Sequence, residues 1–305
     1  MATARSAAPP GAPPDIPGAT NHTVAIETHD AGPLDVHLYV AGEGPPILLL
    51  HGWPQHAWCW RYVIPLLADR YRLIAPDLRG FGWSGAPAGG YDGLTFARDA
   101  VALLDALDLE RAHVIGHDWG GFAAFALALS EPKRVDRMVI LNTAPPWVER
   151  SPRLALQAWR SSYAVMLAAI GEQVARTQPG LIARMLRAGQ VHDGISREDA
   201  LEYAKALQRP ESARATALLY RSYLKAAPAV GSGRFDDMRL TVPTRFLFGQ
   251  QDKALSPLIL RGLENHADDL VVELVPDSGH FIPEEKPELV AQRADELFSG
   301  STVSE

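Results

Sequence analysis

Short apolar runs that end at glycine or proline alternate with helical stretches along most of this 305-residue chain. Three of these runs, Ile47–Leu50, Leu73–Ala75 and Val114–Ile115, are each followed within two residues by glycine or proline. Continuous apolar strands of this kind are typical of a parallel sheet that is buried on both faces. Helical patterns cover Ala57–Leu67 and Thr95–Leu107 between them. The alternation predicts an α/β fold, whose ligands are expected at the carboxyl ends of its strands.

One long stretch interrupts this alternation. Before it, an opening hairpin is expected over Thr23–Glu27 and Val36–Ala41, and a further strand over Met138–Leu141. From about residue 144 to residue 233 there is no convincing strand, and the apolar spacing predicts four helices: Leu154–Ala169, Gly180–Ala188, Ser196–Gln208 and Ala213–Ala227. Strands and helices then alternate again over Thr244–Phe248, Ser256–Asn265, Val271–Val275 and Pro287–Phe298.

A helical block between two halves of one sheet is typical of an inserted cap. We therefore expect an α/β core over residues 21–145 and 233–305, with a helical cap over residues 146–232 above the carboxyl edge of the sheet. Residues 1–20 contain five prolines and are expected to form a disordered tail. The prolines also break the apolar stretch that a secretory signal needs, and no apolar run is long enough to cross a membrane. A soluble, cytoplasmic protein is expected.

Composition narrows the classes of partner. The chain has 29 Lys and Arg against 36 Asp and Glu, and this net charge of −7 gives no basic face for nucleic acid or an anionic membrane. Cys59 is the single cysteine, so an internal disulfide and a cysteine-based zinc site are excluded. The ten histidines form no plausible metal cluster, and there is no phosphate-binding loop. We expect no metal and no cofactor, and the sequence leaves the oligomeric state open.

The most informative motif is Gly116-His117-Asp118-Trp119-Gly120-Gly121, which lies between an expected strand, Ala112–Ile115, and an expected helix, Phe122–Ser130. It matches the G-x-nucleophile-x-G turn, with aspartate where serine usually lies. The glycines permit a sharp turn that exposes the middle side chain, and the helix N-terminus stabilises negative charge there. Taken alone, Asp118 would also suit a helix N-cap.

Two residues further along the chain complete a triad in the order nucleophile, acid, base. Asp252 follows the strand Thr244–Phe248, and His280 follows the strand Val271–Val275. Because parallel strands end at one edge of a sheet, both side chains are expected near Asp118. Asp277 is a rival for the acid, but it is too close in sequence to His280 to come from a separate loop.

The loop His51-Gly52-Trp53-Pro54 follows the strand Ile47–Leu50 and predicts an oxyanion hole. Its donors would be the backbone N–H groups of Trp53 and Trp119, in a dry setting that strengthens each hydrogen bond. The segment Asp77–Gly80 also suits this fold, and we interpret it as structuring a loop.

These motifs together resemble the α/β-hydrolase superfamily, specifically its aspartate-nucleophile branch, which includes epoxide hydrolases and haloalkane dehalogenases. The resemblance runs from about His22 to the end of the last helix and is strongest outside the expected cap. It implies that an ionised Asp118 displaces a leaving group at an sp³ carbon and forms an alkyl ester. His280, oriented by Asp252, would then activate water against the ester carbonyl.

The leaving group separates the two activities. Epoxide hydrolases of this branch use two cap tyrosines as proton donors, and the resemblance implies Tyr220 as one and Tyr163 as the other, with Tyr223 and Tyr203 in reserve. Tyr163 is chosen because it is expected to share a helical face with Leu156, Trp159 and Met166, although packing is the usual role of such a face. The substrate expected is a small apolar epoxide.

Three alternatives to an epoxide hydrolase are considered. A haloalkane dehalogenase would keep Trp119 as one halide donor and take a second tryptophan from the cap, Trp159 or Trp147. A fluoroacetate-type dehalogenase is disfavoured, because the resemblance to that type would require arginine directly after the aspartate. This chain has Trp119 there. A non-catalytic binding protein of the same fold predicts a broken triad or a missing oxyanion loop, and the sequence has neither defect.

Overall fold

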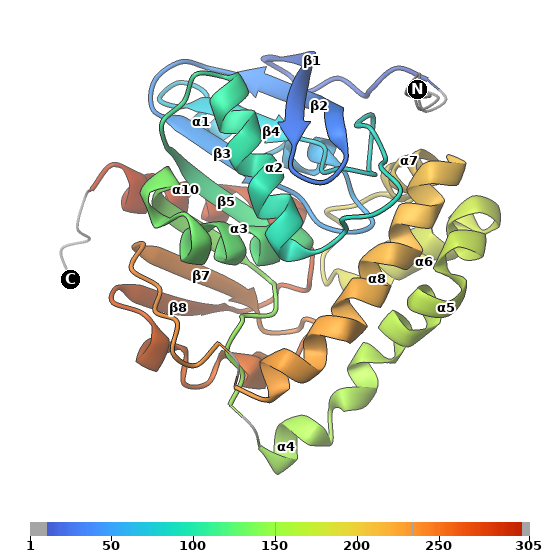
Figure 1. Cartoon of the computed structure of the whole chain (residues 1–305), viewed down its shortest axis with the longest axis vertical. Helices are drawn as coiled ribbons and strands as arrows, with labels where there is room; N and C mark the ends of the chain where they lie inside the picture. The colour runs from blue at the N-terminus through green and yellow to red at the C-terminus, as the bar shows by residue number, and fades with distance from the viewer. Residues whose placement is uncertain (1–10, 150, 234, 301–305) are drawn as a thin grey trace.

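The computed structural model describes residues 11–149, 151–233 and 235–300, which build a layered α/β fold (Figure 1). Eight strands form one sheet in the order β1-β2-β4-β3-β5-β6-β7-β8. Pairing is antiparallel for β1 with β2 and for β2 with β4, and parallel across the rest. The strands are β1 (Ala19–Thr28), β2 (Gly32–Ala41), β3 (Pro46–Leu50), β4 (Arg72–Pro76), β5 (Ala112–His117), β6 (Val135–Leu141), β7 (Thr244–Gly249) and β8 (Leu270–Val275).

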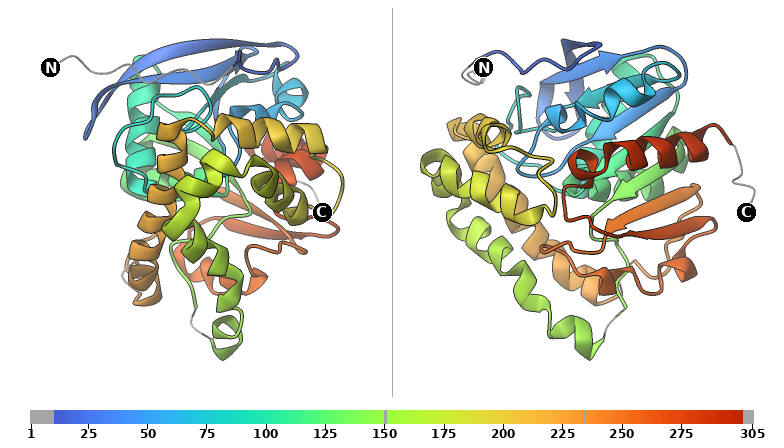
Figure 2. Two further views of the ribbon diagram at one scale, coloured as in Figure 1. Left: turned by 90° about the vertical axis from the view of Figure 1, so that its right-hand side faces the viewer. Right: turned by 180° about the vertical axis from the view of Figure 1, so that it is seen from behind.

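Helices cover both faces of the sheet. α2 (Gly93–Ala106) and α3 (Trp119–Ser130) lie on one face, while α1 (Ile64–Leu67) and α10 (Pro287–Phe298) lie on the other (Figures 1 and 2). Burial follows from this arrangement, because every residue of the central strand β5 is buried. The predicted α/β sheet with flanking helices is confirmed.

A long helical insertion connects β6 to β7. Its elements are α4 (Pro152–Ala155), the 3-10 helix η3 (Ala158–Ser161), α5 (Ser162–Thr177), α6 (Pro179–Gly189), α7 (Arg197–Ala206) and α8 (Pro210–Gly231). α5 packs along α8, and α6 packs against α7 (Figure 2). In the described part of the chain, no helix is long and apolar enough to cross a membrane.

The helix predicted over Leu154–Ala169 is wrong in its first half. The chain breaks into α4, η3 and α5, and the side chains of Leu156 and Trp159 are 79% and 69% exposed. Tyr163 and Met166 do pack on the core, so the inner face expected for the four residues is kept only within α5. Two further predicted helices are also shorter and tighter than expected: Ala57–Leu67 forms the 3-10 helix η1 (Ala57–Trp60) and α1, and Ser256–Asn265 forms the 3-10 helices η4 (Pro257–Leu260) and η5 (Leu263–His266).

The chain becomes ordered earlier than the prolines suggested. Residues 1–10 of the predicted disordered tail lie outside the described residues, but Ile16 is 3% exposed. The Tyr39 hydroxyl donates to the Pro14 carbonyl at 2.6 Å, and the Trp83 indole donates to the Gly11 carbonyl at 3.1 Å. The prediction of disorder is therefore wrong for residues 11–20, because the side chains of Tyr39 and Trp83 hydrogen-bond the backbone of this segment.

Candidate active site

Asp118 occupies the sharp turn between β5 and α3. Its backbone has φ 49° and ψ −116°, a conformation that non-glycine residues rarely adopt and that is common at functional sites. The turn depends on glycine at position 120, because a Cβ there would lie 2.0 Å from the Leu50 carbonyl oxygen. Gly52 is required for the same reason: a Cβ there would lie 2.4 Å from the Cβ of Asp118.

The Asp118 carboxylate faces two backbone donors. The Trp53 N–H donates to Oδ2 at 2.9 Å, and the Trp119 N–H also hydrogen-bonds the carboxylate. These are the two groups that the sequence assigned to an oxyanion hole. Burial raises the pKa of Asp118 to about 6, against the opposing effects of His280 and the two N–H groups. The carboxyl group is therefore mostly ionised at neutral pH.

His280 and Asp252 lie beside Asp118, at the ends of β8 and β7. The His280 Nδ1 donates to Asp252 Oδ2 at 2.7 Å, while its Nε2 lies 3.8 Å from Asp118 Oδ1. This orientation leaves Nε2 facing the carboxylate. Burial alone would lower the pKa of His280, but the carboxylates of Asp252 and Asp118 raise it to about 9.

Asp252 is held by three further donors. Asn142 Nδ2 donates to Oδ2 at 2.8 Å, and the backbone N–H groups of Ala254 and Leu255 donate to Oδ1 at 2.7 and 2.9 Å. Burial raises the pKa of Asp252, but His280 and these hydrogen bonds outweigh it and the pKa is lowered. No sequence motif pointed to Asn142, although a polar residue directly after the buried strand β6 was a usable signal.

The loop around His280 is tied down at each residue. The His280 N–H donates to the Gly189 carbonyl of the insertion at 2.9 Å, and its own carbonyl accepts from His117 Nε2 at 2.8 Å. The Glu285 carboxylate accepts from the N–H groups of Gly279 and Phe281, at 3.0 and 3.1 Å. His117 is thus packed against the loop. Glu285 is a further residue to which no sequence motif pointed.

Two tyrosines line a small cavity together with Asp118. This cavity, of about 40 Å³, includes Tyr163 from α5 and Tyr220 from α8, whose ring centroids are 5.8 Å apart. Burial, and after it the neighbouring charges, raises the pKa of both hydroxyls well above the usual range. Both tyrosines therefore keep their protons at neutral pH and can donate them. No group of three or more metal-ligating side chains occurs within residues 11–149, 151–233 and 235–300.

The family model for the alpha/beta hydrolase fold matches residues 45–287. The chain belongs to the α/β-hydrolase fold family. A soluble epoxide hydrolase from Corynebacterium sp. (strain C12) is 32% identical over 289 residues, which cover 87% of this chain and 93% of that protein. Haloalkane dehalogenase 2 of Mycobacterium tuberculosis (strain ATCC 25618 / H37Rv) is 33% identical over 269 residues, or 86% and 91% of the two chains. The solved structure of epoxide hydrolase CorEH without ligand has a TM-score of 0.79 and 29% identity, covering 93% of this chain and all of that one. With such relatives, the chain is a hydrolase.

The reserve tyrosines of this α/β hydrolase differ in their positions. Tyr223 lies on α8 and lines the same small cavity as Asp118. Tyr203 does not line it: its hydroxyl donates to Glu284 at 2.9 Å and accepts from Arg61 at 2.8 Å. Tyr203 is therefore a wrong candidate for a proton donor.

The two tryptophans considered as second halide donors are also directed elsewhere. The Trp147 indole N–H donates to the Phe235 carbonyl at 2.6 Å, and the Trp159 side chain is 69% exposed. Neither lines the cavity beside Asp118. Both candidates are therefore wrong for a donor aimed at a leaving halide.

Two remaining predictions concern acidic residues outside the triad. The rival acid Asp277 accepts a hydrogen bond from Gln251 at 3.3 Å, and His280 instead bonds Asp252. Asp77 accepts from the N–H groups of Ala57 and Trp83, both at 2.8 Å, and so structures the loop as predicted.

Proposed function

We propose that this α/β hydrolase converts an epoxide to a vicinal diol through a covalent ester on Asp118. The observation that carries the proposal is the pair Tyr163 and Tyr220, which lines the cavity that holds the Asp118 carboxylate. Opening an epoxide generates an alkoxide, and two buried, protonated phenols can neutralise it by donating a proton. No cofactor or metal takes part.

In the first half-reaction, a carboxylate oxygen of Asp118 attacks one epoxide carbon from the side opposite the C–O bond. That bond breaks, its electron pair goes to the ring oxygen, and Tyr163 or Tyr220 supplies the proton. The products are an alkyl ester on Asp118 and a hydroxyl on the neighbouring carbon. Positioned proton transfer of this kind contributes roughly 10²–10⁴-fold to rate.

In the second half-reaction, His280 removes a proton from water, which attacks the ester carbonyl carbon. The N–H groups of Trp53 and Trp119 stabilise the negative oxygen of the tetrahedral intermediate, because they already bind that carboxyl group. The intermediate collapses as His280 returns its proton to the departing alkoxide, which releases the diol. The carboxyl proton of Asp118 then passes to the tyrosinate left by ring opening, and this restores the ionised nucleophile and the neutral phenol. Asp252 holds the imidazole in the orientation that this step needs.

The helical insertion serves as a cap in this proposal. Residues 146–232 supply both tyrosines and contact the core beside the nucleophile. Thr216 Oγ1 accepts from the Trp53 indole at 3.2 Å, and Gly189 accepts from the His280 N–H. The two ends of the site are thus held by the same insertion, with residues 21–145 and 233–305 as the core.

Haloalkane dehalogenation is the second candidate, because it needs the same triad and a relative of that class is 33% identical. It also needs N–H donors aimed at the halide. Trp119 is one such residue, but Trp147 and Trp159 are directed elsewhere. Epoxide opening is therefore the better match to the side chains around Asp118.

The deciding experiment offers the purified protein a styrene-type epoxide and a haloalkane, and follows diol and halide release. We expect diol from the epoxide; halide release without diol would refute the proposal. A single turnover in ¹⁸O-water tests the ester, because water attacks the carbonyl carbon and should leave label in Asp118. Label found in the diol alone would mean direct hydration.

Phenylalanine variants test the proton donors. Tyr163→Phe and Tyr220→Phe should each slow ester formation, and the double variant should lose about 10²–10⁴-fold in rate. Tyr223→Phe is the matched control, since Tyr223 lines the same cavity. Unchanged ester formation in the double variant, measured by rapid quench, would remove the two tyrosines from the mechanism.

A further inference from the structure

A second, larger cavity adjoins the one at Asp118. It has a volume of about 550 Å³ and lies between the insertion and the loops that follow β6 and β7. It shares Phe122, Ala144, Tyr223 and Leu255 with the small cavity, so the two spaces meet at these side chains. Its walls are mostly apolar, and its volume is far larger than an epoxide ring needs. The space suits a long hydrocarbon chain.

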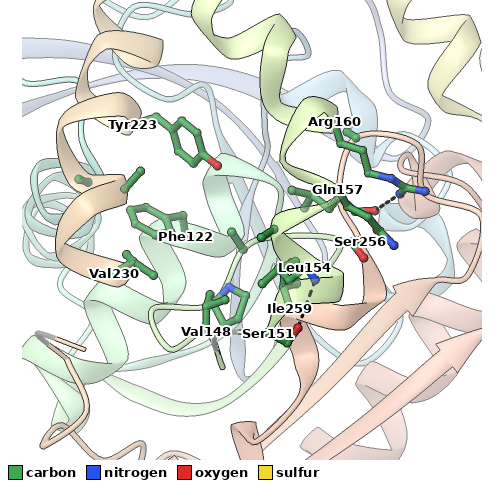
Figure 3. A pocket seen from close by; sticks show the side chains of 17 residues that line it. Phe122, Val148, Ser151, Leu154, Gln157, Arg160, Tyr223, Val230, Ser256 and Ile259 are labelled. Atoms are coloured by element: carbon green, nitrogen blue, oxygen red, sulfur yellow. Dashed lines mark hydrogen bonds between the residues drawn. The ribbon is translucent and has the colours of Figure 1, made fainter. Parts of the chain in front are cut away.

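The far side of this cavity is positively charged. Figure 3 shows Phe122 and Tyr223 on one side of it, with Gln157 and Arg160 on the opposite side. An open hollow at the surface shares Gln157 and Arg160 with the cavity and adds Arg153 of α4. Arg153 and Arg160 are the charged residues among the described ones that line these two spaces, and no acidic residue among them lines either space.

Neither arginine makes an ion pair with any residue that the structure describes. Arg160 Nη1 instead donates to the carbonyls of Asp252 and Leu255, both at 2.9 Å, and its Nε is buried with no partner among those residues. Two buried arginines of the chain do have carboxylate partners: Arg61 pairs with Asp199, and Arg79 with Asp30. In a chain with a net charge of −7, two cations without a carboxylate at the mouth of an apolar cavity indicate an anionic ligand.

Resting on the proposed function, we propose that the substrate is a long-chain epoxide with a carboxylate head group that binds at Arg153 and Arg160. The hydrocarbon chain would run through the large cavity, past Tyr223, and bring the epoxide to Asp118. Burial of the chain supplies affinity, since each buried CH₂ contributes about 0.8 kcal/mol. The arginines would fix the direction in which the chain enters.

A third cavity also borders Asp118. It has a volume of about 250 Å³ and is lined by Asp118, Tyr163 and Tyr220 together with Met185 and Phe281. This space gives room for a hydrocarbon segment beyond the epoxide, so a substrate with the epoxide within its chain is accommodated.

The test compares two substrates of equal chain length and identical epoxide position, one ending in a carboxylate and one in a primary alcohol. We expect kcat/KM to be about tenfold higher for the carboxylate at low ionic strength, with the advantage shrinking as salt is added. Arg153→Gln should remove most of this advantage, so that kcat/KM for the carboxylate falls to about the value for the alcohol with the same variant. Arg160 is unsuitable for the test because it also holds the carbonyl of Asp252.

Arg184→Gln is the matched control, because Arg184 is an exposed arginine of α6 that lines neither of these spaces. It should retain the preference for the carboxylate. Equal kcat/KM for the two substrates in the unaltered protein, or a preference that survives Arg153→Gln, would overturn the head-group site while leaving epoxide hydrolysis intact. Failure to form diol from either substrate, or from a styrene-type epoxide, would instead overturn the proposed function.

Discussion

At the residue scale, the charges of Asp118 and His280 would separate the two half-reactions of the proposed mechanism. Burial raises the pKa of Asp118 to about 6, and the neighbouring carboxylates raise the pKa of His280 to about 9. The resting pair at neutral pH is therefore an ionised nucleophile beside an imidazolium. Ester formation removes the Asp118 charge, and with it one cause of the raised His280 pKa. The imidazole then loses its proton more readily, when a base is needed.

This charge change predicts different pH profiles for the two steps. Ester formation needs ionised Asp118, so its rate should fall as the pH drops through about 6. Ester hydrolysis needs neutral His280, so its rate should rise with pH. The rate should level off below pH 9, because the pKa of about 9 depends partly on the Asp118 charge, which the ester lacks. Rapid-quench measurement of both rates between about pH 4.5 and 9.5 checks whether ester formation titrates at a lower pH than ester hydrolysis. An ester-formation rate that is constant from pH 5 to 7 would contradict it.

Asp252→Asn tests the orienting residue separately. The amide keeps the shape but removes the charge, so the His280 pKa should fall and the imidazole should lose its fixed orientation. We expect ester hydrolysis to slow by about a hundredfold or more, while ester formation changes little and the alkyl-enzyme accumulates. Mass spectrometry of the quenched enzyme measures that accumulation. Asp277→Asn is the matched control, and equal effects of the two substitutions would refute the assignment of Asp252.

At the element scale, the sequence predicted the strands better than the insertion. The strands β3, β4 and β5 are apolar runs bounded by glycine or proline. Because β5, β7 and β8 were also expected to be parallel, Asp118, Asp252 and His280 were placed at one edge of the sheet, where the structure has them. The break between α4 and α5 was missed because apolar spacing does not reveal that Leu156 and Trp159 face solvent. Asn142 was missed because its partner, the Asp252 side chain, is 110 residues away. Glu285 was missed because its role depends on how the loop around His280 folds back toward its carboxylate.

Glu285, in the short helix α9 (Ile282–Glu285), illustrates how a single element positions the catalytic loop. Besides the N–H groups on both sides of His280, its carboxylate accepts from the Val191 N–H of the insertion at 2.7 Å. Glu285→Gln replaces one acceptor oxygen by an NH₂ group and removes a charge that raises the His280 pKa. The pH profile of ester hydrolysis should shift downward, with the rate reduced about tenfold. The exposed Glu288→Gln of α10 is the control, and identical profiles for the two variants would contradict a positioning role.

At the scale of the whole molecule, a buried polar cluster joins the insertion to both catalytic loops. Tyr203 and Asp199 of α7 contact Arg61, which pairs with Glu284 four residues after His280. Gln55, two residues after Trp53, donates to the same Glu284 carboxylate. A cluster of this kind is costly to break, because removing one partner leaves a buried charge without compensation. It therefore couples the packing of α7 to the distance between the oxyanion loop and the histidine loop.

Tyr203→Phe is the mildest way to weaken this cluster. The ring and its packing stay, but Glu284 loses a donor and Arg61 an acceptor, which should lower the free energy of unfolding by about 1.5–3 kcal/mol. Tyr62→Phe is the matched control: its side chain is 44% exposed, so a change within about 0.5 kcal/mol is expected. Urea unfolding measures both. Because the cluster spans the two catalytic loops, Tyr203→Phe should also reduce the rate of ester hydrolysis, whereas a loss of stability with unchanged kinetics would mean that the cluster holds α7 in place without positioning the site.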